Sequence, residues 1–236
     1  MKSVFGKVLM PVWCLLFLGG WLSLANANNV KALPLNTTEG TEAVRVTAKK
    51  INFMGRDGLQ VKVAPDHKSS EEGGCDNCTF LLVDKEPFKN GVIEIDLAGK
   101  PSEGAPAWAR GFVGVVFRVN EDKSKYEGFY LRPMNALEKG PRRNFATQYF
   151  SFPDYPWHRL RKEFPNQYEA YADVKPGEWI NLRIEVDGAT AKFIINGQQV
   201  LAVAKMFNGA NLAGGIGLFT EPETDAYFSN LRVTYK

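Results

Sequence analysis

Apolar and polar residues alternate along most of the chain after residue 27, which is the pattern of β-strands with one buried face. Residues 91–97 are the strictest example. The dipeptides Asp187-Gly188 and Asn196-Gly197 predict tight hairpins, because type I′ turns need a positive φ at both central residues. The pattern predicts strands at residues 43–53, 59–63, 79–83, 91–97, 111–120, 126–133, 168–174, 179–186, 189–195, 198–203, 215–219 and 226–235.

The same pattern predicts almost no helix after the first 27 residues. Only residues 203–208 are compatible with a single helical turn. About a dozen short strands joined by hairpin turns indicate an all-β protein, and we predict a two-sheet antiparallel β-sandwich of the jelly-roll type. A closed β-barrel is the competing prediction. The chain has 236 residues, enough for one sizeable core, so residues 28–236 are expected to form one domain.

Two adjacent strand-like runs begin at residue 111 and at residue 126. When their apolar sets face inward, Arg118, Tyr130 and Arg132 are expected together on the opposite face. Residues 134–165 follow as a long loop insertion rich in proline and aromatic residues. A loop of this length in a compact domain is usually functional. We therefore predict a binding surface on this face, with the insertion as its roof.

The first 27 residues have the layout of a signal peptide. Lys2 and Lys7 precede or open an apolar run at residues 8–24, and Ala25-Asn26-Ala27 has the small residues of a cleavage site. This predicts removal of residues 1–27 and a secreted or periplasmic protein without a stable membrane span. An uncleaved membrane anchor is the alternative.

Two cysteines remain after this segment, Cys75 and Cys78, with two residues between them. In an exported protein they are expected to form a short local disulfide. A thioredoxin-like motif would open a helix, whereas strand-like residues follow here. A zinc site would need two further ligands, and the only histidines are His67 and His158.

Charge is concentrated in one segment. The formal net charge of +3 falls to +1 without Lys2 and Lys7, which does not suggest a nucleic-acid partner. Residues 132–163, however, hold seven Lys and Arg against three acidic residues. Arginine presents fixed donors to carboxylate, sulfate or sugar oxygens, so this segment indicates an anionic or hydroxyl-rich ligand. A solvated loop surface is the alternative interpretation.

The C-terminal strands carry a family resemblance. The motifs are Trp179, Arg183-Ile-Glu-Val186, Phe193-Ile-Ile-Asn-Gly197, Gly214-Gly-Ile-Gly-Leu218 and Phe228-Ser-Asn-Leu-Arg-Val233. Together they resemble the concanavalin A-like lectin/glucanase jelly rolls, most closely the laminin-G-like and 3-keto-disaccharide-hydrolase branches. The resemblance covers about residues 43–236 and implies the fold. It does not choose between sugar-binding modules, glycoside hydrolases and polysaccharide lyases, because fold alone does not set activity.

Two enzyme types of this superfamily leave no signature in the chain. The nearest match to the glucanase motif Glu-x-Asp-x-x-Glu is Glu94-Ile-Asp96, which lacks the second Glu, and we expect these two acids to face solvent. The alginate-lyase pair of motifs, Arg-x-Glu and Gln-x-His, is incomplete, because Gln-x-His is absent: Phe150 stands where Gln148 would require the His.

An enzyme could use other residues. Glycosidases need two carboxylates, and Asp154 and Glu163 lie in the insertion. A lyase needs a base beside a group that neutralises a carboxylate, for which Arg118, Arg132 or Asn135 is available. If the protein is an enzyme, the predicted catalytic residues are Glu127, Glu169, Tyr130 and His158. The structural alternatives are an ion pair with an Arg for Glu169 and stacking between Trp157 and Arg159 for His158.

A binding protein needs only planar polar groups for hydroxyls and aromatic rings for the C–H faces of sugars. The predicted ligand-binding residues are Arg118, Tyr130, Arg132, Asn135, Asn144, Gln148, Tyr149, Trp157, Arg159, Arg161 and Tyr171. No cofactor is expected, although Glu221, Glu223 and Asp225 form an acidic stretch that calcium could use. We predict an exported protein that recognises an oligo- or polysaccharide. The alternatives are a glycan-cleaving enzyme and a structural envelope protein.

Overall fold

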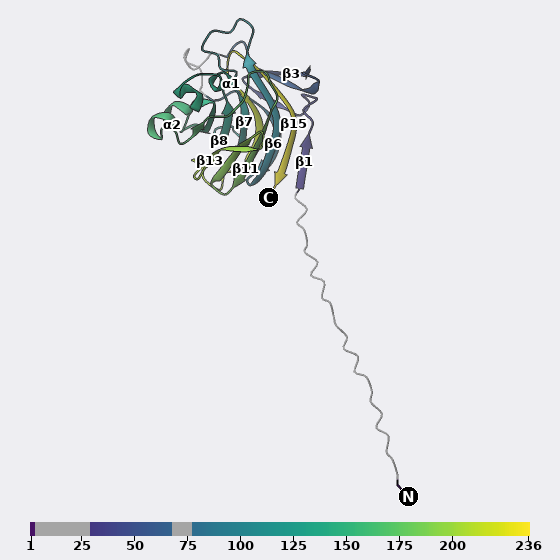
Figure 1. Cartoon of the computed structure of the whole chain (residues 1–236). Helices are drawn as coiled ribbons and strands as arrows, with labels where there is room; N and C mark the ends of the chain where they lie inside the picture. Colours follow the sequence, from purple (N-terminus) through teal and green to yellow (C-terminus); the bar gives the residue numbers. More distant parts are fainter. Residues whose placement is uncertain (3–28, 68–76) are drawn as a thin grey trace.

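Two antiparallel sheets make up the protein (Figure 1). The computed structural model describes residues 1–2, 29–67 and 77–236. Residues 3–27 of the predicted signal peptide and Cys75 of the predicted disulfide lie outside this part of the chain. Among the described residues, no helix is long and apolar enough to cross a membrane.

One sheet has eight strands, and β6 and β15 lie at its centre. It runs in the order β13, β12, β11, β6, β15, β4, β3, and β1 also pairs with β15. The bounds are β1 Asn29–Leu33, β3 Val46–Phe53, β4 Arg56–Val63, β6 Gly91–Pro101, β11 Ile180–Asp187, β12 Thr190–Ile195, β13 Gln198–Val203 and β15 Thr224–Tyr235.

The other sheet has seven strands, in the order β10, β9, β8, β7, β14, β5, β2. Its bounds are β2 Glu42–Val44, β5 Phe80–Phe88, β7 Val113–Val119, β8 Tyr126–Leu131, β9 Thr147–Phe152, β10 Glu169–Ala170 and β14 Gly214–Thr220. Two separate sheets rather than one closed sheet confirm the predicted sandwich.

The predicted hairpins join β11 to β12 and β12 to β13. Asn196 and Gly197 have φ 49° and 82°, as a type I′ turn requires. In the first hairpin only Gly188, with φ 56°, has a positive φ, so this turn is not of type I′. Glu94 and Asp96 in β6 are partly exposed and pair with Arg183 and Arg56. The expectation that these two acids face solvent is therefore met.

The core lies between the sheets. Buried apolar side chains of both sheets form one continuous cluster. The rings of Phe129 in β8 and Phe193 in β12 stack across the interface with centroids 4.1 Å apart. Side chains on neighbouring strand positions point to opposite faces, so Tyr130 lies on the outer face of the seven-stranded sheet. There it packs beside Phe150 and Phe219, with centroid distances of 5.8 and 5.1 Å.

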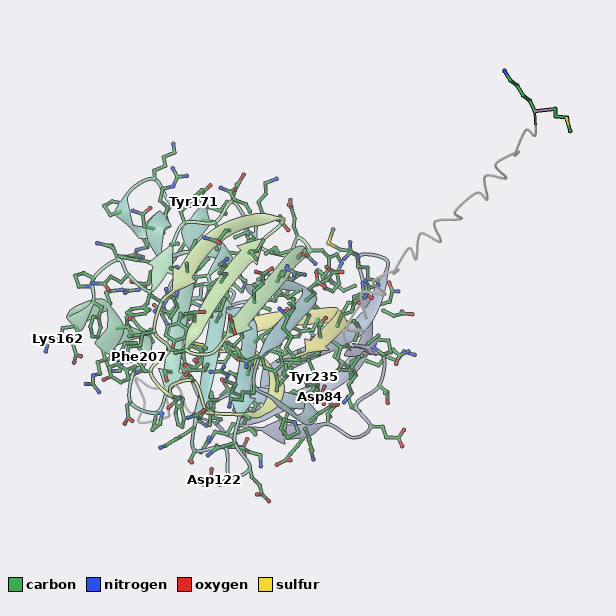
Figure 2. All side chains as sticks on the ribbon, turned by 90° about the horizontal axis from the view of Figure 1, so that it is seen from below. Asp84, Asp122, Lys162, Tyr171, Phe207 and Tyr235 are labelled. Atoms are coloured by element: carbon green, nitrogen blue, oxygen red, sulfur yellow. The ribbon has the colours of Figure 1, made fainter. Side chains whose placement is uncertain are left out.

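A polar contact also ties one side of the sandwich together. Tyr235 in β15 donates a hydrogen bond of 2.6 Å to Asp84 in β5, so it joins the two sheets (Figure 2). Lys31 in β1 forms an ion pair of 2.7 Å with the same carboxylate. The end of the described chain is thereby fixed to the opposite sheet.

The segment 134–165 is more ordered than predicted. It contains α1 (Pro133–Ala136), the 3-10 helix η2 (Pro141–Phe145), β9 and α2 (Trp157–Glu163). Figure 1 shows α1 and α2 beside β7 and β8, on the side of the molecule away from β1. The prediction of an irregular loop was wrong for β9, because its aromatic residues alternate only over six positions. The strand predicted at 168–174 shrinks to β10, which pairs with β9 through two residues.

Candidate functional site

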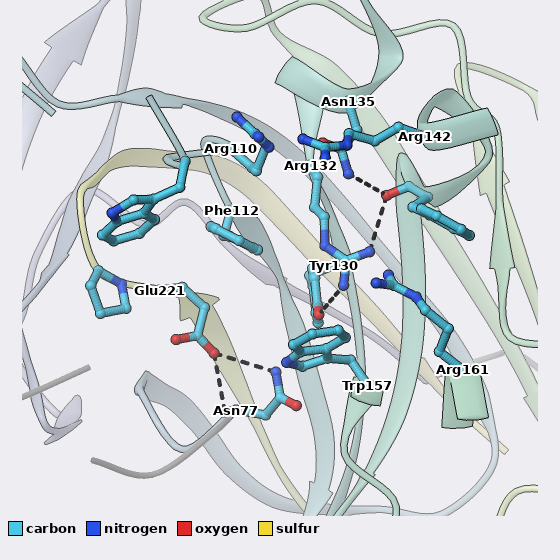
Figure 3. Close-up of a pocket in the computed structure, with 13 residues that line it drawn as sticks. Asn77, Arg110, Phe112, Tyr130, Arg132, Asn135, Arg142, Trp157, Arg161 and Glu221 are labelled. Atoms are coloured by element: carbon cyan, nitrogen blue, oxygen red, sulfur yellow. Dashed lines mark hydrogen bonds between the residues drawn. The ribbon is translucent and has the colours of Figure 1, made fainter. Parts of the chain in front are cut away.

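A pocket of about 340 Å³ opens on the outer face of the seven-stranded sheet, where β8 ends (Figure 3). We call it the arginine pocket. Its walls come from the β6–β7 loop, β8, α1, η2, α2 and the β14–β15 turn. It is lined by Asn77, Trp108, Arg110, Phe112, Tyr130, Arg132, Asn135, Arg142, Phe145, Trp157, Arg161, Glu221 and Pro222.

Arg132 fixes the floor of the pocket. It follows β8 directly and is 5% exposed. Its Nη2 donates to the hydroxyl of Tyr130 at 2.7 Å, and its Nη1 donates to the carbonyl oxygen of Phe145 at 3.0 Å. Burial is the main cause that raises the pKa of Tyr130; Arg132 lowers it and Glu221 raises it, and together these effects bring the pKa to about 12. Tyr130 therefore stays a neutral phenol at neutral pH and is a poor base.

Two arginines share one buried carboxylate behind this floor. Arg132 Nη1 lies 3.2 Å from Glu169 Oε1, and Arg161 Nε donates to Glu169 Oε2 at 3.0 Å. Arg161 Nη2 also binds Oε1 of the same carboxylate. The side chain of Glu169 is only 2% exposed, so its carboxylate binds the two arginines and is shielded from solvent.

Trp157 stands at the wall between these arginines. The guanidinium carbons of Arg161 and Arg132 lie 4.7 and 5.8 Å from its ring centroid. Both distances are within the range of cation–π attraction, which orients the indole from α2. Trp157 remains partly exposed, so the arginines hold an aromatic surface that a ligand can contact.

Glu221 and Asn77 form the opposite wall (Figure 3). Glu221 Oε1 accepts hydrogen bonds from the backbone N of Asn77 at 3.1 Å and from its Nδ2 at 3.3 Å. The pocket thus has a carboxylate on one side and guanidinium groups on the other.

The rim carries an exposed indole and two more arginines. Trp108 is 46% exposed. Among the large apolar side chains that are exposed in the described part of the chain, it is the one aromatic residue. Arg110 and Arg142 project from the β6–β7 loop and from η2. An exposed aromatic ring beside a polar pocket is a surface that a sugar ring can stack on.

Two buried amide oxygens in the pocket wall lack partners. Asn77 and Asn135 are 1% and 4% exposed. Their Oδ1 atoms have no hydrogen-bond partner among the described residues, although both amide nitrogens donate, to Glu221 and to the carbonyl oxygen of Phe145. Unsatisfied buried acceptors are rare in folded proteins. Both of those found in the described chain belong to this pocket.

Five predicted ligand-binding residues line the pocket, and the other six do not. Those that line it are Tyr130, Arg132, Asn135, Trp157 and Arg161. Gln148 lies behind the floor, is fully buried, and accepts a hydrogen bond of 3.3 Å from Arg132. Asn144 is exposed in η2. Tyr171 lies under the guanidinium of Arg143, 4.1 Å from its ring centroid.

Arg118 is not beside Tyr130 and Arg132, so the prediction that these three lie together was wrong. Arg118 has a φ of 56°, and the pairing of β7 with β14 shifts register before Val119. This bulge breaks the alternation on which the prediction rested. The guanidinium instead donates to the carbonyl oxygens of three turns, at Lys89 (2.8 Å), Gly188 (2.7 Å) and Gly209 (3.0 Å).

Glu127 and Tyr149 lie near Arg118, on the inner face of the sheet. Tyr149 donates a hydrogen bond of 2.6 Å to Glu127 Oε2, and the backbone N of Asn208 donates to Oε1 at 3.1 Å. Burial raises the pKa of both Glu127 and Tyr149. We call Arg118, Glu127, Tyr149 and Asn208 the closed cluster. It lies outside the arginine pocket, which removes Glu127 and Tyr149 from its lining.

The remaining predicted catalytic residues do not line the pocket. Glu169 is held by Arg132 and Arg161 as described. His158 is exposed on α2, with its ring at the edge of Trp157 and centroids 5.6 Å apart. Arg159 pairs with Glu163 at 2.9 Å and donates to the carbonyl oxygen of Asp154.

The acids of the β14–β15 turn diverge rather than meet. Glu221 points into the pocket, Glu223 is exposed, and Asp225 pairs with Lys62 at 2.8 Å. Within residues 29–67 and 77–236, no three His, Cys, Asp or Glu side chains form a group that could hold a metal ion. The three acids of this turn therefore do not converge on one point.

Eight lining residues were not among the predicted ligand-binding residues: Asn77, Trp108, Arg110, Phe112, Arg142, Phe145, Glu221 and Pro222. Trp108 and Arg110 close a loop of proline, glycine and alanine, where an isolated Trp-x-Arg was the available signal. Nothing in the sequence indicated that Asn77 and Glu221, 144 residues apart, would meet.

Solved structures similar to this one share its fold at low identity. The carbohydrate-binding module CBM66 from Bacillus subtilis is 15% identical over 82% of this chain and 98% of that chain, with a TM-score of 0.50. A protein of unknown function with a galectin-like fold from Bacillus subtilis is 14% identical, over 87% and 94%, with a TM-score of 0.54. A candidate glycosyl hydrolase from Parabacteroides distasonis is 16% identical, over 87% and 100%, with a TM-score of 0.50.

At the level of sequence, no curated protein matches the chain. Residues 20–234 match the family described as the 3-keto-alpha-glucoside-1,2-lyase-like domain. The match spans nearly the whole chain and confirms the resemblance read from its C-terminal strands. The chain belongs to the family of 3-keto-alpha-glucoside-1,2-lyase-like domains.

Proposed function

We propose that the arginine pocket binds a sugar unit of a glycan and that the protein is a carbohydrate-recognition protein. The observation that carries the proposal is the combination of two indole faces, Trp108 and Trp157, with guanidinium and amide groups around one pocket. Sugar rings offer C–H faces to aromatic rings and hydroxyls to planar polar groups. The pocket has both kinds of surface within one volume.

The unpartnered amide oxygens support a hydroxyl-rich ligand. Asn77 Oδ1 and Asn135 Oδ1 need hydrogen-bond donors that no described residue supplies. Both oxygens are buried in the wall, so the donor they need is a small one, a water held between the sugar and the wall. The pocket volume of about 340 Å³ lies at the lower end of typical small-molecule sites, which fits one or two sugar units rather than a long groove.

The arrangement of carboxylates favours binding over glycoside hydrolysis. A glycosidase needs two carboxyl groups that flank the scissile bond. Of the described residues that line the pocket, Glu221 is the one carboxylate. Glu169 lies behind the wall, where Arg132 and Arg161 hold both of its oxygens.

A purely structural role for the protein would explain only some of the arginines in and around the pocket. The ion pairs of Arg132 and Arg161 with Glu169 and of Arg159 with Glu163 are those that a purely structural protein would have. Such a protein would close the space between them. The open pocket with an exposed indole at its rim supports ligand binding instead.

The fold and the family are consistent with a glycan partner. The chain is similar in fold to a carbohydrate-binding module and to a candidate glycosyl hydrolase, and it belongs to a lyase-like domain family. These likenesses support a carbohydrate-binding or glycoside hydrolase-like domain. The choice between the two rests on the pocket.

Cleavage of the glycan is the second candidate, and Glu221 is the observation that favours it. A lyase removes a proton next to an electron-withdrawing group; a C=C bond forms, the C–O bond on the neighbouring carbon breaks, and the leaving oxygen takes the proton back from the base. This needs one base and a positive group to stabilise the developing charge. Glu221 is available as the base, and Arg132 or Arg110 on the far side is available as the stabilising group. This chemistry needs no second carboxylate.

Calorimetric titration of the purified protein with neutral and acidic oligosaccharides tests the proposal, with each mixture then examined for shortened or unsaturated products. We expect saturable binding without cleavage, weakened about tenfold or more in Trp157→Ala. Arg159→Ala, on the same helix but outside the pocket, is the matched control. Product formation that Glu221→Gln abolishes while binding persists would replace the binding proposal with the second candidate. Absence of binding to every oligosaccharide would refute both.

We also propose that the protein acts outside the cytoplasm. The proposal rests on Lys2, Lys7, the apolar run at 8–24 and the small residues at 25–27. Sequencing the N-terminus of the protein recovered from its host should give Asn28 as the first residue. An intact N-terminus in the membrane fraction would identify an uncleaved anchor instead.

A further inference from the structure

We propose that Arg110 and Arg142 form a subsite for an anionic substituent of the glycan, a carboxylate or a sulfate on the sugar ring. The inference rests on the proposed function, since it concerns the ligand of the same pocket. It adds the chemical class of that ligand: an acidic sugar.

The pocket wall carries more positive than negative charge. Four arginines line it, Arg110, Arg132, Arg142 and Arg161, against one glutamate. The carboxylate of Glu169 behind the wall neutralises only part of the charge of Arg132 and Arg161, because the two share it. Part of the surplus therefore stays at Arg132 and Arg161, and the rest lies on the rim, at Arg110 and Arg142.

Arg110 has hydrogen-bond donors that the described residues do not use. Its Nη1 donates to the carbonyl oxygens of Ala107 at 2.7 Å and Ala109 at 3.4 Å, and it forms no ion pair with a described carboxylate. Its Nε and Nη2 have no acceptor among the described residues. Burial lowers the pKa of Arg110, the charges of Arg142 and Arg132 add to that effect, and the charge of Glu138 opposes it. An anion placed here would relieve this repulsion.

Arg142 is only weakly engaged. Its Nη1 lies 4.0 Å from Glu138 Oε1, and the two side chains are 57% and 44% exposed. An exposed pair at this distance contributes little and exchanges readily with a ligand anion. Figure 3 places Arg110 and Arg142 on the same side of the pocket, opposite Glu221 and Asn77.

This polarity would orient an acidic sugar. Guanidinium groups bind planar oxyanions through two parallel hydrogen bonds, so the acidic group belongs beside Arg110 and Arg142. Glu221 repels an anion on the opposite side. The ring then lies between the two poles, where Trp157 offers an aromatic face.

Matched pairs of oligosaccharides that differ only in charge test the inference. The probes are trigalacturonate and its methyl ester, and a chondroitin disaccharide with and without its sulfate, together with a panel of other acidic and neutral oligosaccharides. We expect the charged member of a bound pair to bind about tenfold tighter or more. Its advantage should shrink as salt is raised, because the subsite is partly exposed.

Arg110→Gln and Arg142→Gln should each remove most of that advantage. Arg143→Gln is the matched control: it removes the same charge from η2, but Arg143 stacks on Tyr171 and does not line the pocket. We expect its affinities to equal those of the original protein. Preference for the uronate pair, for the sulfate pair or for both identifies the source of the anion.

The outcomes separate the two proposals. Equal affinity for charged and neutral members, binding of neutral oligosaccharides alone, or an acidic preference that survives in Arg110→Gln and Arg142→Gln would overturn the anionic subsite. The glycan-binding function would stand in each of these cases. If no oligosaccharide binds, the proposed function fails and the subsite fails with it.

Discussion

Arg118 and Arg132 lie at opposite ends of the β7–β8 hairpin and are both nearly buried, at 0% and 5% exposure. The guanidinium of Arg118 donates its hydrogen bonds to backbone carbonyl oxygens of three turns. Arg132 binds side chains instead, among them Tyr130 and Glu169, whose neighbours line an open pocket. The first arginine joins loops, whereas the second holds the wall of a site.

The surroundings of the two arginines differ in the same way. In the closed cluster, Glu127, Tyr149 and Asn208 satisfy one another within the protein. In the arginine pocket, the Oδ1 atoms of Asn77 and Asn135 lack a hydrogen-bond partner among the described residues. The Nε and Nη2 donors of Arg110 also lack one there. A buried charge therefore indicates a binding site only where its neighbours are left unsatisfied and open to a ligand.

The strongest test of this comparison is Arg118→Ala. The substitution leaves the carbonyl oxygens of Lys89, Gly188 and Gly209 without their charged donor inside the protein. We expect a loss of about 3 kcal/mol or more in the free energy of unfolding, measured by chemical denaturation. Glycan affinity of the folded fraction should be unchanged. Loss of affinity without loss of stability would assign Arg118 to the site after all.

Trp108→Ala should have the opposite effect. Its indole is 46% exposed and lines the pocket, so glycan affinity in calorimetry should fall about five- to tenfold. The free energy of unfolding should change by less than about 0.5 kcal/mol. Leu137→Ala removes an apolar side chain that is 54% exposed and does not line the pocket, and it should change neither quantity. Equal effects of the two variants would mean that Trp108 is not a contact.

Glu127→Gln should change the pH dependence of stability. Burial raises the pKa of Glu127 in the folded state, so the folded protein keeps this proton to a higher pH than the unfolded chain does. The protonated Glu127 side chain contributes its full stability to the folded protein below the pKa of the unfolded chain, about 4.3. This contribution is lost as the pH rises through the higher pKa of the folded protein. The Tm of the original protein should therefore fall relative to that of Glu127→Gln as the pH increases. A Tm difference that does not vary with pH would contradict the buried-acid interpretation.

Arg159→Ala should have the smallest effect. Arg159 contacts Glu163 and the carbonyl oxygen of Asp154 on the outside of α2, away from the pocket. Exposed pairs of this kind contribute little in water. We expect neither Tm nor glycan affinity to change measurably. A clear loss of affinity would extend the binding surface along α2 and weaken the contrast between paired and unpaired arginines.

The strands could be predicted because their causes are local. Asp187-Gly188 and Asn196-Gly197 specify turns with positive φ, and alternation specifies which side of each strand is buried. Tyr130 and Arg132 were placed on the correct face by this rule alone. The rule failed at Arg118, because one residue with positive φ reverses the alternation and the sequence around it carries no glycine to announce the bulge.

The pocket needed tertiary structure, because its walls come from segments that are distant in the sequence. Asn77 meets Glu221 across 144 residues, and Arg110 reaches the pocket from a loop that has no alternating pattern. Composition correctly drew attention to the basic segment at 132–163, but whether each cation is paired depends on which carboxylate packs beside it. The sequence by itself determined the sandwich and its inward faces, since turns and alternation act between neighbours. Only packing between strands decided which arginines are satisfied by the protein and which remain open to a ligand.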